Sequence, residues 1–124
     1  MKKCLVVIDM QNGFIKQGTE HLPNRIIEFI EHSSFERIVA TRYCNTFETA
    51  LEFLKNEKFD RLYFCGVNTD CCVLATVISC YDNVQDCIVL ADLCASTLGE
   101  IKHNHALDLL RDNITPERVI NSWD

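Results

Sequence analysis

The stretch Leu62-Tyr-Phe-Cys-Gly-Val-Asn-Thr-Asp-Cys-Cys-Val73 decides how this chain folds and where its chemistry lies. Its first half is an apolar run, which is typical of a strand that is buried on both faces of a sheet. The polar residues that follow include Thr69 and Asp70, and either side chain can cap a helix that begins at the cysteines. The pattern therefore predicts a strand at 62–67 and a helix at about 70–81.

The same alternation of strand and helix continues on both sides of this stretch. Similar apolar runs predict further strands at 4–8, from 37 to about 43, at 86–91 and at 119–120. Helical periodicity and capping patterns predict helices at about 23–32, 47–58 and 97–110, the last opening on a capping box at Thr97-x-x-Glu100. Near-continuous apolar strands that alternate with helices predict an α/β fold, a three-layer αβα Rossmann-like parallel sheet of about five strands. Residues 1–124 are expected to form a single domain.

The charge balance and the hydropathy exclude several classes of partner. Lys and Arg number 12 against 18 for Asp and Glu, which gives a net charge of −6, and no basic stripe is present. Neither nucleic acid nor an anionic membrane surface is therefore an expected partner. No apolar run approaches the roughly 18 residues of a membrane helix, and Asp9 ends the first apolar run too early for a signal peptide. A cytoplasmic location is expected.

The eight cysteines are interpreted as reduced thiols rather than as a disulfide framework. Cys4, Cys65 and Cys87 lie in strand-like runs and Cys80 in a helix-like run, where cysteine behaves as a small buried hydrophobe. No two cysteines have the C-x-x-C spacing that favours zinc or redox chemistry. At most one or two of these thiols need a special role.

Two polar residues at predicted strand ends are candidates for chemistry, because active sites in open parallel sheets gather beyond the carboxyl ends of the strands. Asp9 ends an apolar strand with no helix nearby to cap, and a buried carboxylate needs a partner. Cys72 lies near the start of the predicted helix, where free N–H groups and the helix dipole favour a thiolate and could bind an oxyanion. Asp9 can be a general base for Cys72 or only a hydrogen-bond anchor, and Cys72 can be a nucleophile or a structural residue.

Three segments resemble the isochorismatase-like cysteine hydrolases, the group that includes the nicotinamidases. Val6-Val-Ile-Asp-Met-Gln-Asn-Gly-Phe14 is similar to the opening of these proteins, and Gly66-Val-Asn-Thr-Asp-Cys-Cys-Val-Leu-Ala-Thr76 is similar to their nucleophile segment. Val89-Leu-Ala-Asp-Leu-Cys-Ala-Ser96 resembles the exit of a later strand. The segments follow one another in the same order as in the family and together span most of the chain.

The resemblance implies a reaction as well as a fold. It implies that Cys72 is the nucleophile, that Asp9 is the base, and that a small amide-like or ester-like substrate is cleaved through a thioester. It also implies a cis peptide bond between Val67 and Asn68, in a loop that includes Cys71 and serves the oxyanion. A small molecule is therefore the expected substrate, and no cofactor is expected.

The sequence departs from the family by one helix–strand unit after the second strand, and the family's catalytic lysine is missing with it. Arg42, at the end of the second predicted strand, is the first candidate to replace this lysine electrostatically, although a guanidinium does not give up its proton. Lys16, in the loop after the first strand, is the second candidate. Either residue can instead be an ordinary solvated cation.

No metal is expected either. The nicotinamidase branch binds a metal through an aspartate and histidines after the second strand, and this chain has no histidine there. His21, His103 and His105 fall on predicted loops or helix surfaces. These three side chains are expected to be solvated rather than to act as ligands.

Two other functions remain alternatives. A degenerate, non-catalytic member of the family, which keeps the fold as a binding or oligomerisation module, would explain the missing lysine. A phospho-receiver of similar length would need clustered carboxylates after the first strand, where this chain has only Asp9. The missing unit also leaves the second strand at the edge of the sheet, and because exposed edges are prone to pairing, a homo-oligomer is expected.

Overall fold

The computed structural model describes residues 1–41, 54 and 56–123. Its five strands are β1 (Lys3–Ile8), β2 (Arg37–Thr41), β3 (Arg61–Val67), β4 (Cys87–Ala95) and β5 (Val119–Ile120). Its longer helices are α1 (Leu22–Glu31), α3 (Leu74–Asp82) and α4 (Glu100–Ile114). Three short helical turns complete the described elements, namely η1 (Asn12–Phe14), η2 (Thr69–Val73) and η3 (Pro116–Arg118).

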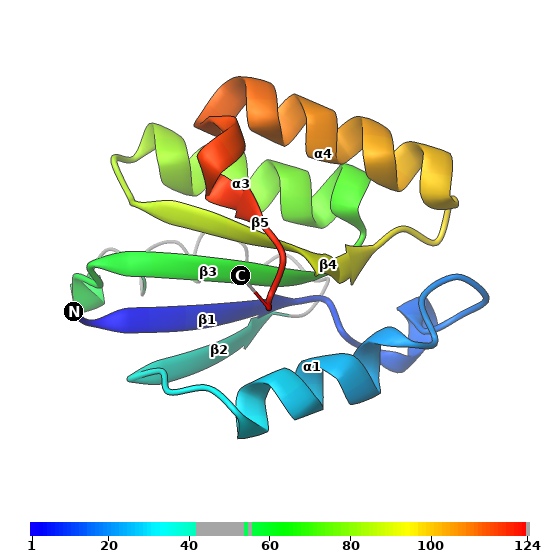
Figure 1. Cartoon of the computed structure of the whole chain (residues 1–124), viewed down its shortest axis with the longest axis horizontal. Coiled ribbons are helices and arrows are strands. Elements are labelled where there is room, and N and C mark those ends of the chain that lie inside the picture. The colour runs from blue at the N-terminus through cyan, green and yellow to red at the C-terminus, as the bar shows by residue number, and fades with distance from the viewer. Residues whose placement is uncertain (42–53, 55, 124) are drawn as a thin grey trace.

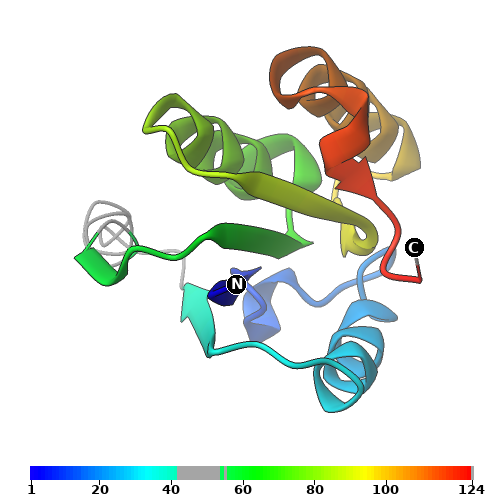
Figure 2. The ribbon, with the colours of Figure 1, turned by 60° about the vertical axis from the view of Figure 1, so that its left-hand side comes forward.

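The five strands form one parallel sheet in the order β2-β1-β3-β4-β5. Helices α3 and α4 lie on one side of this sheet and α1 lies on the other (Figures 1 and 2). The prediction of a five-stranded, three-layer αβα sheet is therefore confirmed. The first and third strands in the sequence are neighbours, so the residues that follow them meet at the same edge.

The core lies on both faces of the sheet, as the apolar strands predict. Successive side chains of a strand point to opposite faces. Val6 and Ile8 of β1 accordingly join the cluster beneath α3 and α4, whereas Leu5 and Val7 join the cluster that contains Leu22 and Ile26 of α1. Strands β3, β4 and β5 also contribute to both clusters, whereas β2 contributes only Val39, to the first.

The cysteines follow the prediction made for them. The seven cysteines within the described residues are free, and Cys4, Cys65, Cys80 and Cys87 are buried. Burial raises the pKa of Cys4 to about 11, although Arg37 partly opposes this shift. These thiols therefore act as small apolar side chains.

The boundaries of two helices differ from the prediction. The helix predicted at about 70–81 begins as the π-helical turn η2 and becomes α-helical only at α3, and neither Thr69 nor Asp70 caps it with a side chain. The capping box predicted at Thr97 is also wrong, because Gly99 is the N-cap of α4 and makes no side-chain cap bond. Thr69 instead contacts His103, and the Thr97 hydroxyl accepts a hydrogen bond from Asn68, so tertiary partners take up the hydroxyl groups that were expected to cap.

Part of the chain after β2 cannot be compared with the prediction. Within the helix predicted at 47–58, residues 54, 56 and 57 are helical, and the rest of that prediction lies outside the described residues. Arg42 also lies outside them.

Strand β4 extends to Ala95, four residues beyond the predicted end at residue 91, because its register shifts past an irregularity and pairs Cys94 with Gly66.

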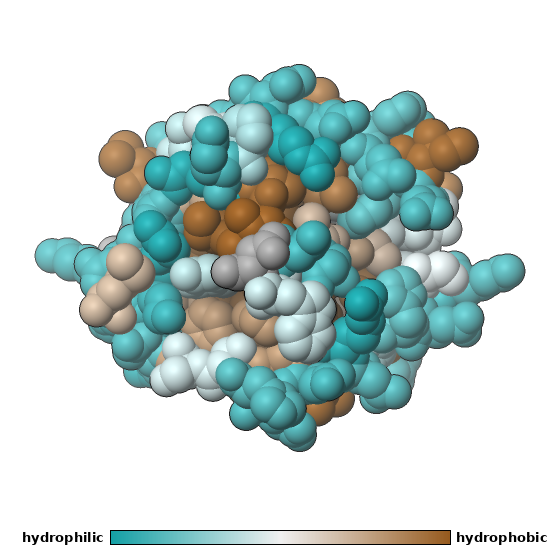
Figure 3. Space-filling view, in the orientation of Figure 1, coloured by the Kyte–Doolittle hydropathy of each residue, from teal (hydrophilic) through white to brown (hydrophobic). Residues whose placement is uncertain are grey.

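The surface is mostly hydrophilic on the face shown in Figure 3, with hydrophobic residues near the centre of that face. The large apolar residues that are exposed come from several elements, for example Ile38 of β2 and Ile101 of α4. No helix within the described residues is both long enough and apolar enough to cross a bilayer.

Candidate active site

The carboxyl ends of β1 and β3 bring the two main candidate residues together. Ile8, the last residue of β1, pairs with Gly66 in β3. Gly66 has a φ of +123°, and a Cβ atom at this position would lie 2.2 Å from the carbonyl oxygen of Ile8. Only glycine allows so close an approach with this backbone conformation. The residues that follow, Asp9 in one chain segment and 67–73 in the other, therefore start from adjacent points of the sheet.

Asp9 is held in place by the neighbouring strand β2. It is 4% exposed and has a φ of 51°, a left-handed conformation that Asp tolerates better than most residues. Its backbone N–H donates to the carbonyl oxygen of Thr41 at 3.1 Å, and the Thr41 hydroxyl donates to its Oδ1 at 3.3 Å. The edge strand thus orients the carboxylate.

The Cys72 side chain is half-buried and its thiol donates a hydrogen bond to the Asp9 side chain. The contact that the strand ends predict is therefore present. The thiol pKa is raised well above its ordinary value, first by burial, then by the hydrogen bond to Asp9 and its negative charge, and further by Cys71. The sequence favoured a thiolate at this position, and that expectation is wrong, because a carboxylate beside a half-buried thiol disfavours the charged form. Burial and the neighbouring Asp9 thus both favour the neutral thiol at Cys72.

The loop before Cys72 has the geometry that the family resemblance implies. The peptide bond between Val67 and Asn68 is cis. The backbone N–H groups of Cys71 and Val73 both donate to the carbonyl oxygen of Asn68 at 3.1 Å, which closes the loop into a compact turn. The Cys71 side chain is exposed.

The Asn68 side chain ties this loop to the segment between β4 and α4. Its Nδ2 donates to the Thr97 hydroxyl at 3.0 Å, and its Oδ1 accepts a hydrogen bond from the Thr97 backbone N–H at 2.9 Å. Thr97, which the sequence assigns to a helix cap, instead holds the loop that carries Cys72.

His103 is a site residue that the sequence pattern did not reveal. It was expected to be solvated, but its Nδ1 lies 2.6 Å from the Oγ1 of Thr69, and the side chain is half-buried. The expectation holds for His21 and His105, which are exposed. Helical spacing contains the missing signal, because position 103 falls on the same face as the buried residues Ala106 and Leu107.

A cation near Cys72, predicted to replace the missing lysine, is not identified among the described residues. Lys16 is exposed, and its backbone N–H donates to the Thr19 hydroxyl at 2.9 Å. Within the described part of the chain, no group of three or more His, Cys, Asp or Glu side chains is arranged to hold a metal ion.

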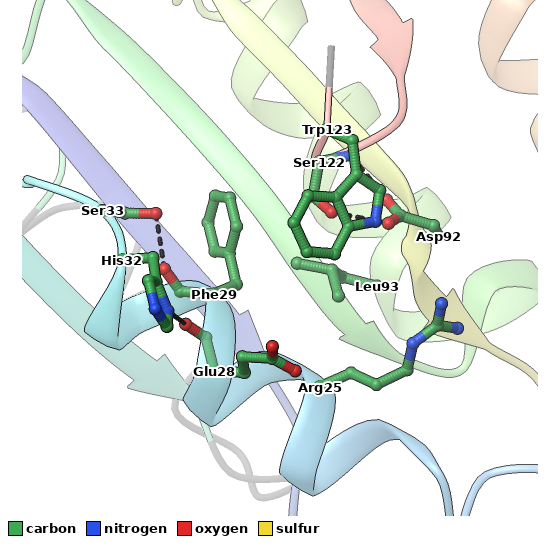
Figure 4. A pocket seen from close by; sticks show the side chains of 9 residues that line it. All are labelled: Arg25, Glu28, Phe29, His32, Ser33, Asp92, Leu93, Ser122 and Trp123. Carbon is green, nitrogen blue, oxygen red and sulfur yellow. Dashed lines mark hydrogen bonds between the residues drawn. The ribbon is translucent and has the colours of Figure 1, made fainter.

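Two cavities border Asp92 of β4, and their linings include neither Cys72 nor Asp9. One, of about 290 Å³, lies between α1 and the C-terminal segment, and Figure 4 shows Phe29 and Trp123 in its wall. The other, of about 360 Å³, is lined partly by His103. His103 thus contacts Thr69, in the loop that carries Cys72, and also lines a cavity.

Comparisons with known proteins agree with this fold. The family model described as the isochorismatase domain matches residues 31–117. No curated protein sequence matches the chain. Three solved structures illustrate the likeness, all of them at low sequence identity.

An isochorismatase-like hydrolase from Alkaliphilus metalliredigens is 19% identical, with a TM-score of 0.76 over 99% of this chain and 96% of that one. A nicotinamidase from Bacillus subtilis is 16% identical, with a TM-score of 0.74 over 98% and 100% of the two chains. A nicotinamidase from Staphylococcus aureus is 17% identical, with a TM-score of 0.72 over 96% and 97%. The structures share the fold, and the family model covers well over half of the sequence, so the chain belongs to the isochorismatase family.

Proposed function

We propose that this protein is a cysteine hydrolase that cleaves a small amide-like C–N bond, or an ester-like bond, through a thioester on Cys72. Asp9 is the general base. The observation that carries the proposal is the hydrogen bond from the Cys72 thiol to the Asp9 side chain, made across two strand ends that are far apart in the sequence. A nucleophile in hydrogen-bond contact with a base that a third group orients is the usual arrangement for covalent catalysis.

The raised pKa of the thiol fits a general-base mechanism. Asp9 takes the thiol proton as the sulfur attacks the substrate carbonyl carbon, so no free thiolate needs to accumulate. The proton then passes to the leaving nitrogen or oxygen as the C–N or C–O bond breaks. Asp9 is left as a carboxylate beside a thioester, and it removes a proton from the water molecule that hydrolyses this thioester and restores the thiol.

The remaining roles belong to the loop and to a cation. Val67, Asn68 and Cys71 form the loop that we propose to face the developing oxyanion. Arg42 is the proposed electrostatic partner of the sulfur or oxyanion, because it directly follows Thr41, which donates to the base. Lys16 is the second candidate for this role.

The proposed enzyme is a cytoplasmic homo-oligomer that acts on a small molecule without a cofactor. Free thiols at the described cysteines favour a reducing compartment. An exposed apolar residue, Ile38, on the outermost strand of the described sheet favours self-association.

Nicotinamide is the first substrate to test, because nicotinamidases are among the solved structures with this fold. Ammonia release should be measured for the wild type and for Cys72→Ala and Asp9→Asn, and we expect each substitution to lower kcat/KM by about 10³-fold or more. The matched control is Cys71→Ser, which keeps the backbone of the proposed oxyanion loop and changes only an exposed side chain, so its activity should stay within about threefold of the wild type. Mass spectrometry of the quenched reaction should find the acyl group on the peptide that contains Cys72.

Full activity of Cys72→Ala would contradict the proposal, and so would loss of activity in Cys71→Ser alone. The non-catalytic alternative makes the opposite prediction. It expects no turnover by the wild type on a panel of small amides and esters that includes nicotinamide, and no acylation of Cys72 by an activated ester such as p-nitrophenyl acetate.

A further inference from the structure

The loop that carries Cys72 contacts α4 through the hydroxyl of Thr69 and the imidazole of His103. Thr69 Oγ1 and His103 Nδ1 lie 2.6 Å apart, and Thr69 is three residues before the nucleophile. Thr69 is fully buried and His103 is half-buried. A hydroxyl in contact with an imidazole can mark a second nucleophile–base pair. That interpretation fails here because substrate cannot reach a side chain with 0% exposure.

We propose that His103 is a positioning residue for Cys72, acting through the Thr69 hydroxyl to hold the 67–73 loop in its closed form. The inference rests on the proposed role of Cys72 as nucleophile. The contact adds to the one between Asn68 and Thr97, so the loop is fixed at two successive residues by partners that lie after β4.

The direction of the hydrogen bond depends on the charge of His103. A neutral imidazole with its hydrogen on Nε2 accepts the Thr69 hydroxyl proton at Nδ1. When His103 is protonated, Nδ1 carries a hydrogen and can only donate to the Thr69 oxygen, so the hydroxyl hydrogen of Thr69 needs another acceptor in a buried place. Such an unmet donor is unfavourable. The neutral form of His103 therefore supports the closed loop and the protonated form opposes it.

The surroundings of His103 favour the neutral form on balance. Burial, the largest influence, lowers the pKa of His103, and His21 and Arg111 act in the same direction. Glu100 and Asp70 oppose them by attracting a positive charge. Because the pKa is lowered, the support is fully present above the ordinary value of about 6.5, and it is lost as the pH falls below that value through the native pKa.

The test is amide hydrogen exchange at Cys71 and Val73, whose N–H groups both bond to the Asn68 carbonyl oxygen, measured between pH 5 and pH 8 with intrinsic rates removed. In the wild type we expect protection at pH 5 to be at least about fivefold lower than at pH 8. His103→Leu and Thr69→Val should lower protection by about tenfold at both pH values. Thr69→Ser, which keeps the hydroxyl, should restore it.

Two further variants separate positioning from a merely structural role. In His103→Asn, the amide oxygen can occupy the place of Nδ1 but cannot titrate, so protection should stay near the wild-type level at pH 8 and should not fall at pH 5. His105→Leu, two residues along α4 at an exposed position, is the matched control and should follow the wild type throughout.

Wild-type protection in His103→Leu would overturn the proposal, and so would an undiminished acid transition in His103→Asn. The exchange measurement needs no turnover, so it tests the loop even if nicotinamide and other amides are not hydrolysed. Failure of the hydrolase proposal is then visible in the activity assay alone.

Discussion

At the scale of single residues, Asp9 has two opposed effects on Cys72. In the proposed mechanism it takes the thiol proton, yet in the resting protein its negative charge raises the pKa of that thiol, although less than burial does. The resting sulfur is consequently a poor nucleophile toward reagents that do not bind beside it. Reactivity toward a general alkylating agent and catalytic competence should therefore respond in opposite directions when Asp9 is changed.

Asp9→Asn is expected to speed the alkylation of Cys72 by iodoacetamide at pH 8 by roughly three- to tenfold while it abolishes hydrolysis. Removal of the negative charge lowers the thiol pKa and enlarges the thiolate fraction, by a factor of ten for each pKa unit. Peptide mass spectrometry on timed samples gives the rate at each cysteine.

Cys71 supplies the internal reference for this measurement, because it is exposed and its alkylation rate should hardly change. Buried thiols such as Cys94, whose pKa burial raises to about 12, should remain unlabelled in the native protein. An unchanged or slower rate at Cys72 in Asp9→Asn would show that the carboxylate does not control the thiol.

At the scale of secondary-structure elements, the carboxyl end of β3 determines where Cys72 lies. Gly66 is the last residue of β3 that pairs with β1, directly beside Ile8, and Val67 after it still pairs with β4. A methyl group there would overlap the backbone of Ile8, and the positive φ disfavours any L side chain. The contact is with backbone atoms, so it cannot be relieved by a rotamer change.

Gly66→Ala should therefore lower the free energy of unfolding by about 3 kcal/mol or more, from backbone strain together with the overlap. Urea denaturation followed by far-UV circular dichroism measures this change, and a variant that does not fold at all is the limiting case of the same result.

The matched control for that substitution is Gly13→Ala. Gly13 is exposed, and a Cβ atom there would meet nothing within 4 Å. Its unfolding free energy should change by no more than about 0.5 kcal/mol. If the two variants were equally stable, β1 and β3 could move apart at this end without any loss in the free energy of unfolding, which would contradict the prediction.

The elements also show what the sequence could and could not predict. The strands were predictable because both faces of the sheet are covered, so continuous apolar runs mark them. The meeting of Asp9 and Cys72 was predictable because parallel strands end at one edge. The roles of Thr97 and His103 were not, because each depends on a tertiary partner in the Cys72 loop. The raised pKa of Cys72 was also hidden, since local position near a helix start says nothing about burial.

At the scale of the whole molecule, the outermost strand β2 leaves apolar surface uncovered. Ile38 is 48% exposed, although its partner in β1, Leu5, is fully buried. Parallel sheets are normally covered on both faces, and apolar edges are open to pairing with another chain.

The protein is therefore expected to sediment as a dimer or larger species at about 50 µM rather than as a 14.3 kDa monomer. Ile38→Lys should shift it toward the monomer, because a charge on the edge strand opposes pairing. Val84→Lys is the matched control, since Val84 is 93% exposed between α3 and β4, and two strands separate β4 from β2 in the sheet. A wild type that sediments as a monomer at this concentration would contradict the expectation of a homo-oligomer.

The loop that carries Cys72 is attached at two places, to Thr97 and to His103. Both come from the part of the chain after β4, whereas Asp9 receives its hydroxyl contact from Thr41 on the opposite flank. The sulfur and the carboxylate thus have separate scaffolds, and a change confined to one flank need not displace the group held by the other. Substitutions in the segment after β4 are therefore expected to disturb the sulfur and to spare the carboxylate, whereas substitutions at Thr41 should do the reverse.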